Sequence, residues 1–137
     1  MKNLETFLKQ LDTLGLNPDD YCIVSSGSLA VRDIRDCSDL DIVCTDKLWF
    51  ESEQKFPNQK RIISGLCEVI TPIENIDFFM FYSQDLKYPR DIQIETADVI
   101  DGKRYHNLEV IKYFKKLQSR DKDLIDLELI KQYENQL

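Results

Sequence analysis

Two aspartates separated by one residue, Asp39 and Asp41, have the residue type and spacing of a metal site. They lie in residues 39–44, DLDIVC, whose alternation of polar and apolar residues is typical of a strand with one covered face. Residues two apart in a strand point to the same side, so the two carboxylates stand next to each other. Two like charges this close repel each other unless a cation lies between them. The spacing therefore predicts a divalent-cation site.

Mg²⁺ is the cation that we expect here, with Mn²⁺ as the alternative. Mg²⁺ takes oxygen ligands from one or two carboxylates and completes its shell with substrate phosphates. A third carboxylate would complete a site for two ions, and Asp77 is the candidate because it stands alone in an apolar strand, where an unliganded charge is costly. Its expected role is metal ligand or general base. Glu68 is the alternative for that role.

Gly27 and Ser28 are the residues that we expect to hold phosphate groups. An apolar strand at 21–24 turns through Ser-Ser-Gly-Ser into a short helix predicted over 29–34. Backbone N–H groups and the dipole at a helix start favour phosphate, and Gly27 would let the backbone approach it while Ser28 adds a hydroxyl donor. Each feature alone has a structural explanation, such as a solvated strand edge for the aspartates. The order of strand, Gly-Ser turn, short helix and Asp-x-Asp strand is what favours a site.

The elements that must position these residues follow from hydrophobic periodicity and turn chemistry. Apolar spacing predicts a helix over 4–14 ending near Gly15, and Thr45 or Asp46 is expected to cap a second helix reaching about Lys55. Further predictions are strands at 61–64 and 67–71 with Gly65 in a hairpin turn, a strand at 76–81, an extended piece at 97–100, a helix from Asn107 through Leu108, Ile111, Phe114 and Leu117, and a last helix through Leu124, Leu127 and Ile130. Residues 83–96 are ambiguous.

Strands and helices interleave without a repeat or a linker, which predicts a single domain over 1–137. The expected class is α/β (α+β), a mixed sheet flanked by helices with two helices at the C-terminus. The four cysteines form no Cys-x-x-Cys pair, so we expect free and mostly buried thiols, and the single histidine, His106, is expected to be structural.

The charge balance and the N-terminal residues limit the classes of partner. A formal net charge of −7 argues against a protein that grips long nucleic acid, although it permits a small anionic substrate held by metal ions or a basic partner protein. No run approaches the ~18–20 apolar residues that span a bilayer, and MKNLETFLKQ lacks the apolar run of a secretion signal. We therefore expect a cytoplasmic protein with no membrane association.

Residues 26–43, SGSLAVRDIRDCSDLDIV, resemble the signature of the DNA polymerase beta-like nucleotidyltransferase superfamily. That signature is a hydrophobic residue, Gly, then Gly or Ser, a gap, and Asp-hydrophobic-Asp. Here the gap runs over 29–38, and Ser26 stands where an apolar residue is usual. The tail SRDKDLIDL, residues 119–127, is similar to small bacterial and archaeal nucleotidyltransferase-like proteins that often end in Arg-x-Lys-Asp-x-x-Asp. The resemblance extends over 21–130 and is loose over 46–75.

The resemblance implies a nucleotidyltransferase-type sheet and assigns roles by position. Gly27 and Ser28 would hold the triphosphate, and Asp39, Asp41 and Asp77 would ligate two Mg²⁺ ions. Arg120 and Lys122 would contact phosphate, or else begin a helix with solvated charges. Asp123 and Asp126 would lie in the first turns of that helix, where acidic residues are favoured by the dipole alone.

The activity that this implies is transfer of a nucleoside monophosphate from an NTP, with ATP favoured, to an acceptor hydroxyl with release of pyrophosphate. The acceptor could be a protein side chain, an RNA end or a small molecule. The chain is short, so a partner protein or a homodimer is expected to complete the acceptor site. The alternative function is a partner-binding module of the toxin–antitoxin type with this fold and little or no turnover.

Overall fold

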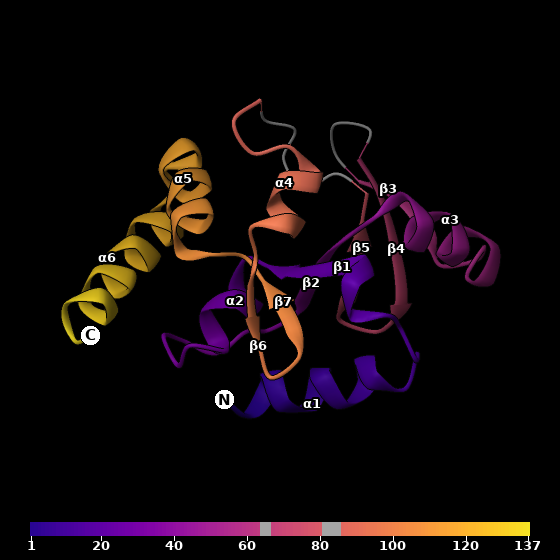
Figure 1. Ribbon diagram of the computed structural model, residues 1–137, viewed down its shortest axis with the longest axis horizontal. Helices are drawn as coiled ribbons and strands as arrows, with labels where there is room; N and C mark the ends of the chain where they lie inside the picture. The colour runs from indigo at the N-terminus through magenta and orange to yellow at the C-terminus, as the bar shows by residue number, and fades with distance from the viewer. Residues whose placement is uncertain (64–66, 81–85) are drawn as a thin grey trace.

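A mixed β-sheet runs through the centre of the computed structural model, which describes residues 1–63, 67–80 and 86–137 (Figure 1). Its strands are β1 (Tyr21–Val24), β2 (Leu40–Cys44), β3 (Lys60–Ile63), β4 (Cys67–Ile73), β5 (Ile76–Phe79), β6 (Asp98–Ile100) and β7 (Lys103–Tyr105). The spatial order is β3-β4-β5-β2-β1-β7-β6. β2 lies at the middle of the sheet, antiparallel to β1 and parallel to β5, while β1 and β7 are parallel.

Helices cover both faces of the sheet. They are α1 (Lys2–Asp12), α2 (Ser26–Ala30), α3 (Asp46–Lys55), α4 (Arg90–Glu95), α5 (Leu108–Gln118) and α6 (Asp121–Asn135), and a 3₁₀ turn spans Pro18–Asp20. Side chains of α1 and α3 pack with Ile42 in the main core, whereas Ile94 of α4 packs with Val43 in a second cluster. Because Ile42 and Val43 are consecutive strand residues, the two clusters lie on opposite faces. Figure 1 shows α1 and α4 on these opposite sides.

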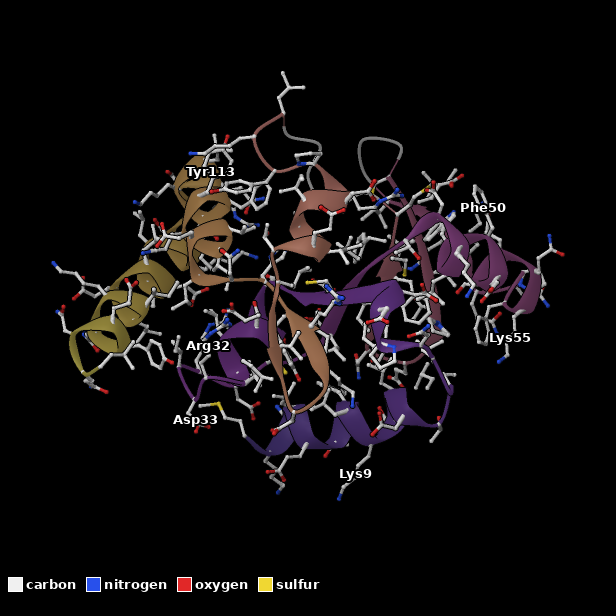
Figure 2. The ribbon with its side chains drawn as sticks, viewed as in Figure 1. Lys9, Arg32, Asp33, Phe50, Lys55 and Tyr113 are labelled. Atoms are coloured by element: carbon white, nitrogen blue, oxygen red, sulfur yellow. The ribbon has the colours of Figure 1, made fainter. Side chains whose placement is uncertain are left out.

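The mixed sheet, the flanking helices and the two C-terminal helices confirm the predicted fold class. Two predicted helix caps are also confirmed. The Thr45 hydroxyl accepts a hydrogen bond from the N–H of Leu48, and the Asn107 side chain accepts one from the N–H of Val110. Each cap satisfies an N–H group that has no partner within its helix. Figure 2 shows Lys9 and Lys55 at the outer surface of α1 and α3.

Several predicted boundaries differ from the structure. α2 begins at Ser26, so Gly27 and Ser28 lie inside the helix and not in the turn before it. β2 begins at Leu40, which leaves Asp39 immediately before the strand. α4 lies in the region that the sequence left ambiguous, and β7 was not predicted at all. The predicted turn at Gly65 and the end of the strand at 81 lie outside the described residues.

The two C-terminal helices pack on the domain through a small apolar cluster of Leu29, Ile111 and Ile130. The expected apolar face of the last helix is partly wrong, because Leu124 is 54% exposed. The helix instead buries Asp123 and Asp126 beside Ile130. None of the described helices is long and apolar enough to cross a membrane.

The cysteines and the histidine mostly follow the predictions. Cys22, Cys37 and Cys44 are buried free thiols, while Cys67 is a partly exposed one. His106 is buried, and its Nε2 lies 2.8 Å from Gln93 Oε1. Burial, with a contribution from the charge of a nearby arginine, lowers the pKa of His106 to about 3, so the ring is neutral.

Candidate active site

Asp41 and Asp77 lie side by side on neighbouring strands. β2 and β5 run parallel, and Asp41 pairs in register with Asp77, so both side chains project to the same face of the sheet. Further along β2, α4 covers that face, where Val43 packs with Ile94. Asp39 precedes the strand, and its charge raises the pKa of Asp41. The topology therefore brings the three predicted carboxylates within electrostatic reach of one another.

Asp39 and Asp41 are partly buried and form no hydrogen bond or ion pair with the described residues. Burial, followed by the charges of Asp39 and Asp77, raises the pKa of Asp41 from 3.8 to about 7. Burial and the charge of Asp77 also raise the pKa of Asp39. Partly buried carboxylates without a partner are uncommon, since proteins satisfy nearly all of their buried polar groups. No cation of the described residues forms an ion pair with these two carboxylates, and their pKa values stay raised.

Asp77 differs from the other two carboxylates because protein groups already contact it. The Thr71 hydroxyl donates a hydrogen bond of 2.6 Å to Asp77 Oδ1, and Arg61 Nη2 lies 3.6 Å from the same oxygen. Both contacts involve Oδ1, and Oδ2 accepts no hydrogen bond from the described residues. One oxygen of Asp77 is therefore held in place on the strand position beside Asp41.

Glu68, the alternative third carboxylate, lies elsewhere. It is in β4 directly before Val69, and Val69 pairs with Phe79 of β5. Phe79 is two residues after Asp77 and shares its face, so Glu68 projects to the opposite face. Glu68 Oε1 forms an ion pair of 3.4 Å with Lys60, which also contacts Glu53 of α3. Asp77, and not Glu68, therefore shares a face with Asp41.

Two cations from distant parts of the chain act on the aspartate pair. The charge of Lys122, which is exposed in the first turn of α6, lowers the pKa of both Asp39 and Asp41. The charge of Arg35 lowers the pKa of Asp39. Lys122 is thus within electrostatic range of the carboxylates, and its contact with phosphate stays a prediction.

Gly27 is required by packing against the sheet. A Cβ atom at this position would lie 2.6 Å from Ile23 Cγ2 and 2.8 Å from Leu40 Cδ1, closer than real Cβ atoms approach other atoms. Any side chain here would push α2 away from β1 and β2. The expected reason for this glycine, close approach of the backbone to a ligand, is therefore not needed to explain it.

Ser28 is buried, and its hydroxyl donates a hydrogen bond to the carbonyl oxygen of Ser25. Its own carbonyl oxygen accepts a hydrogen bond of 2.7 Å from Arg32 Nη1, while Arg32 Nη2 contacts Asp98 at 2.6 Å. The Ser28 side chain thus stabilises the turn between β1 and α2. That turn lies beside the carboxylates, because Val24, the last residue of β1, pairs with Asp41.

Ser25 has a left-handed backbone conformation, with φ 54° and ψ −130°. Such conformations cost of order 1–3 kcal/mol in a residue other than glycine. A cavity of about 20 Å³, lined partly by Ser25, His106, Lys115 and Arg120, lies against this turn. It has room for about one water molecule.

Arg120 is occupied by contacts at the start of α6. Its Nε donates a hydrogen bond of 2.7 Å to Asp123 Oδ2, and its Nη2 donates one of 2.6 Å to Gln118 Oε1. The backbone N–H of Arg120 also donates to Asp123, which completes a capping box. The observed role of Arg120 is to cap the helix.

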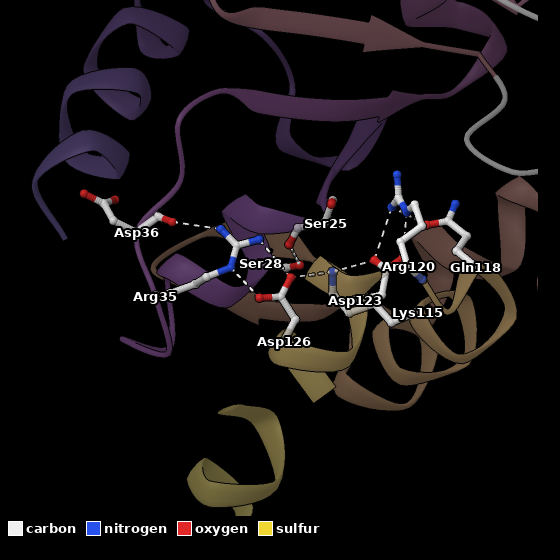
Figure 3. Close-up of polar contacts among 9 residues, drawn as sticks. All are labelled: Ser25, Ser28, Arg35, Asp36, Lys115, Gln118, Arg120, Asp123 and Asp126. Atoms are coloured by element: carbon white, nitrogen blue, oxygen red, sulfur yellow. Dashed lines mark hydrogen bonds and ion pairs between the residues drawn. The ribbon is translucent and has the colours of Figure 1, made fainter. Parts of the chain in front are cut away.

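A buried ionic network joins α5 and α6 to the segment before Asp39 (Figure 3). Arg35 Nε and Nη2 donate to the two carboxylate oxygens of Asp126 at 2.6 and 2.9 Å, and Lys115 Nζ donates to Asp126 at 2.8 Å. Lys115 also lies 3.6 Å from Asp123. Burial alone would raise the pKa values of Asp126 and Asp123. The hydrogen bonds that these carboxylates accept lower both pKa values instead.

Arg35 and Lys115 are not among the residues that the sequence predicts for the site. The helix dipole alone does not account for the position of Asp126, which both of them contact. A signal was nevertheless present. Lys115 is four residues after Ile111, and Asp126 is four before Ile130, so each charge falls on the buried face of its helix. A Lys and an Asp on facing apolar stripes predict a buried ion pair.

The carboxylates fit Mg²⁺ in part. In residues 1–63, 67–80 and 86–137, no group of three or more His, Cys, Asp or Glu side chains is arranged to hold a metal ion. Asp39 and Asp41 nevertheless supply unpartnered, mutually repelling oxygen donors, and Mg²⁺ uses one or two carboxylates with the rest of its shell from water and phosphate. The pair therefore fits Mg²⁺, whereas the third ligand and the second ion remain predictions.

A cation at the aspartates, with an anion between it and Lys122, would offset the charges that raise their pKa values. This combination suits a phosphate-bearing substrate. Comparison of the chain with protein-family models, with curated proteins and with solved structures gives no match.

Proposed function

We propose that the chain is a metal-dependent nucleotidyltransferase, which moves a nucleoside monophosphate from an NTP to an acceptor hydroxyl. The observation that carries the proposal is the pair of partly buried, unpartnered aspartates, Asp39 and Asp41, beside Asp77. Folding alone gives no reason to place three carboxylates together, because their repulsion opposes it. The Gly-Ser and Asp-x-Asp signature in the sequence supports the same reaction class. ATP is the favoured donor, and the cytoplasm is the expected compartment.

The reaction assigns a role to each group at the site. The acceptor hydroxyl oxygen attacks the α-phosphorus, the bond from the α-phosphorus to the bridging oxygen breaks, and pyrophosphate leaves with the electron pair. Asp39 and Asp41 would hold Mg²⁺, which neutralises charge on the phosphoryl oxygens. Asp77 Oδ2 accepts the hydroxyl proton, since Oδ1 is held by Thr71. Lys122 binds the departing phosphates.

The acceptor is a hydroxyl of a protein, an RNA end or a small molecule. The net charge of −7 disfavours long nucleic acid among these. A partner protein or a second copy of the chain would complete the acceptor site.

A partner-binding role is the second candidate, and exposed apolar side chains on the C-terminal helices favour it. Leu117, Leu124 and Ile125 are 59%, 54% and 62% exposed. Apolar residues on the outer side of a helix are typical of a surface that another element covers. Under this reading, the protein binds its partner with little or no nucleotide turnover. Replacing Asp39 and Asp41 would then leave its biological effect intact.

The decisive experiment is isothermal titration of each NTP, with Mg²⁺, into the wild type and the Asp39→Asn, Asp41→Asn double variant. We expect Mg²⁺-dependent binding of at least one NTP to the wild type, and binding weaker by about 100-fold in the double variant. Glu68→Gln is the matched control, because it removes a carboxylate from the opposite face, and it should bind as the wild type does. If folded wild type bound no NTP, the proposal would fail and the partner-binding role would replace it.

A further inference from the structure

Asp126 is the centre of the ionic network between the C-terminal helices and the rest of the domain. Both of its oxygens are used, in a two-point contact with Arg35 and a contact with Lys115 (Figure 3). The Asp126 side chain is 3% exposed and that of Lys115 is 9% exposed. Arg–carboxylate pairs with two parallel hydrogen bonds fix relative orientation as well as distance. Asp126 thus sets how the first turns of α6 sit against the segment that contains Arg35.

Both ends of this contact lie close in sequence to the proposed active site. Lys122 is four residues before Asp126 in α6, so the two residues lie on the same side of the helix, one turn apart. Arg35 is four residues before Asp39, and its Nη1 also donates to the carbonyl oxygen of Asp36 at 3.1 Å. A rigid connection therefore runs from the turn of α6 that carries Lys122 to the segment that leads into the Asp-x-Asp strand.

We infer that Asp126 is a positioning residue for the proposed transfer, because it anchors α6 to Arg35 and thereby places Lys122 over the carboxylates to receive the phosphates of the NTP. This inference rests on the proposed function. Apart from this contact, α6 packs on the domain through one small apolar cluster and, near its C-terminal end, through an ion pair of 3.0 Å between Glu134 and Lys112 of α5. Apolar contacts are not directional, so they position Lys122 less closely than paired hydrogen bonds do.

A double-mutant cycle between Asp126→Asn and Lys122→Ala tests the inference, with the affinity for Mg²⁺–ATP measured by titration calorimetry. We expect Asp126→Asn to weaken binding by about 10-fold or more in the wild-type background. In the Lys122→Ala background, the same change should weaken binding by less than about 2-fold, because the group through which Asp126 acts is gone. If Asp126 had a purely structural role, Asp126→Asn would reduce the affinity for Mg²⁺–ATP equally in both backgrounds. That result would overturn the inference.

Asp98→Asn is the matched control, since it breaks another Arg–Asp contact of 2.6 Å, with Arg32, away from α6. It should change binding by less than about 2-fold. If Asp126→Asn does not fold, the Asp126→Asn, Lys115→Met variant replaces it in the cycle, because it removes one charge of each sign and keeps the interior balanced.

Hydrogen exchange tests whether Asp126 anchors α6, independently of whether that anchoring affects NTP binding. Backbone N–H groups over 121–130 should exchange at least about 10-fold faster in Asp126→Asn, while those of β1 and β2 keep their protection. Faster exchange with unchanged NTP affinity would overturn the positioning role alone. Absence of NTP binding in the wild type would instead overturn the proposed function, and the inference with it.

Discussion

Two pairs of closely spaced aspartates in this protein have opposite surroundings. Asp39 and Asp41 form no hydrogen bond or ion pair with the described residues. Burial raises both of their pKa values, as do the charge of Asp77 on Asp39 and the charges of Asp39 and Asp77 on Asp41. Asp123 and Asp126 are more deeply buried, yet hydrogen bonds from Arg120, Arg35 and Lys115 lower their pKa values. The second pair is satisfied by the fold, whereas the first has no direct partner among the described residues, which is what the proposed metal site would explain.

The difference shows how a site can be told from a structural charge cluster. Burial alone does not distinguish the pairs, and neither does spacing along the chain. The presence of hydrogen-bonding partners does distinguish the two pairs. A fold that leaves carboxylates unpaired gives up stability that pairing would have supplied. Such a loss is usual where ligand binding restores the balance.

The largest expected effect is a difference in the free energy of unfolding between variants of the two aspartate pairs. Asp126→Ala should lower the free energy of unfolding by about 3 kcal/mol, because Lys115 and Arg35 lose their buried counter-ion. Asp39→Ala should change it by less than about 1 kcal/mol and in the stabilising direction. Urea unfolding at pH 7.5 measures both, with circular dichroism as the signal. Equal destabilisation by the two changes would contradict the comparison.

The stability gained by Asp41→Asn should depend on pH. The pKa of this carboxyl is raised from 3.8 to about 7 in the folded chain, so the folded state holds a proton that the unfolded state has lost between these values. Its contribution to stability is thus present at low pH and is lost as pH rises through about 7. Relative to the wild type, Asp41→Asn should be more stable by about 2 kcal/mol at pH 8 and nearly equal at pH 4.

Thermal unfolding of both proteins across that pH range measures the difference. Asp33→Asn, a change at an exposed aspartate, is the control and should show no such trend. If the stability gain of Asp41→Asn grew toward low pH instead, it would contradict a raised pKa of Asp41 in the folded chain.

Mg²⁺ should stabilise the wild type through the first pair. A tenfold excess of the ion over its dissociation constant contributes about 1.4 kcal/mol, and the midpoint of thermal unfolding should rise accordingly at pH 8. The rise should shrink at pH 5.5, where protons compete for Asp41, and vanish in Asp41→Asn. Asp126→Asn retains both ligands, so if it folds it should retain a Mg²⁺ response. A response that survives in Asp41→Asn would place the ion elsewhere.

The smallest effect concerns Lys122, whose charge acts on Asp39 and Asp41. Lys122→Ala should change the free energy of unfolding by less than about 0.5 kcal/mol, because this side chain is exposed. It should nevertheless raise the pKa of Asp41, whose carboxylate loses a nearby positive charge. Carbon-13 NMR titration of the aspartate carboxyl groups measures the shift. Lys131→Ala, further along α6, is the matched control and should leave that pKa unchanged.

Local patterns predicted those parts of the fold that depend on neighbouring residues. The Asp-x-Asp strand, the Thr45 and Asn107 caps and the apolar face of α1 each follow from spacing within one element. β7 did not follow, because Lys-Arg-Tyr has neither the length nor the alternation of a strand and forms only through pairing with β1 and β6. The sheet supplies the partners that make this segment extended.

The same distinction between local pattern and long-range packing applies to the residues of the candidate site. Strand geometry predicts that Asp39 and Asp41 lie together, and although β2 begins only at Leu40, the charge of Asp39 does act on Asp41. It could not choose between Asp77 and Glu68, which the order and register of β4 and β5 decide. The role of Asp126 was also out of reach, because its partners lie 91 and 11 residues away. Contacts of that kind come from packing and not from local pattern.

The close approach of Gly27 to Ile23 and Leu40 has a consequence for how relatives of this chain would diverge. A descendant that lost the proposed activity but retained the fold would still need this glycine, whereas Asp39 and Asp41, which form no hydrogen bond or ion pair with the described residues, would be free to change. Under the proposed function, the two halves of the motif would be under different kinds of selection. Among such descendants, the glycine records ancestry of the fold, and only the aspartates record continued use of the site.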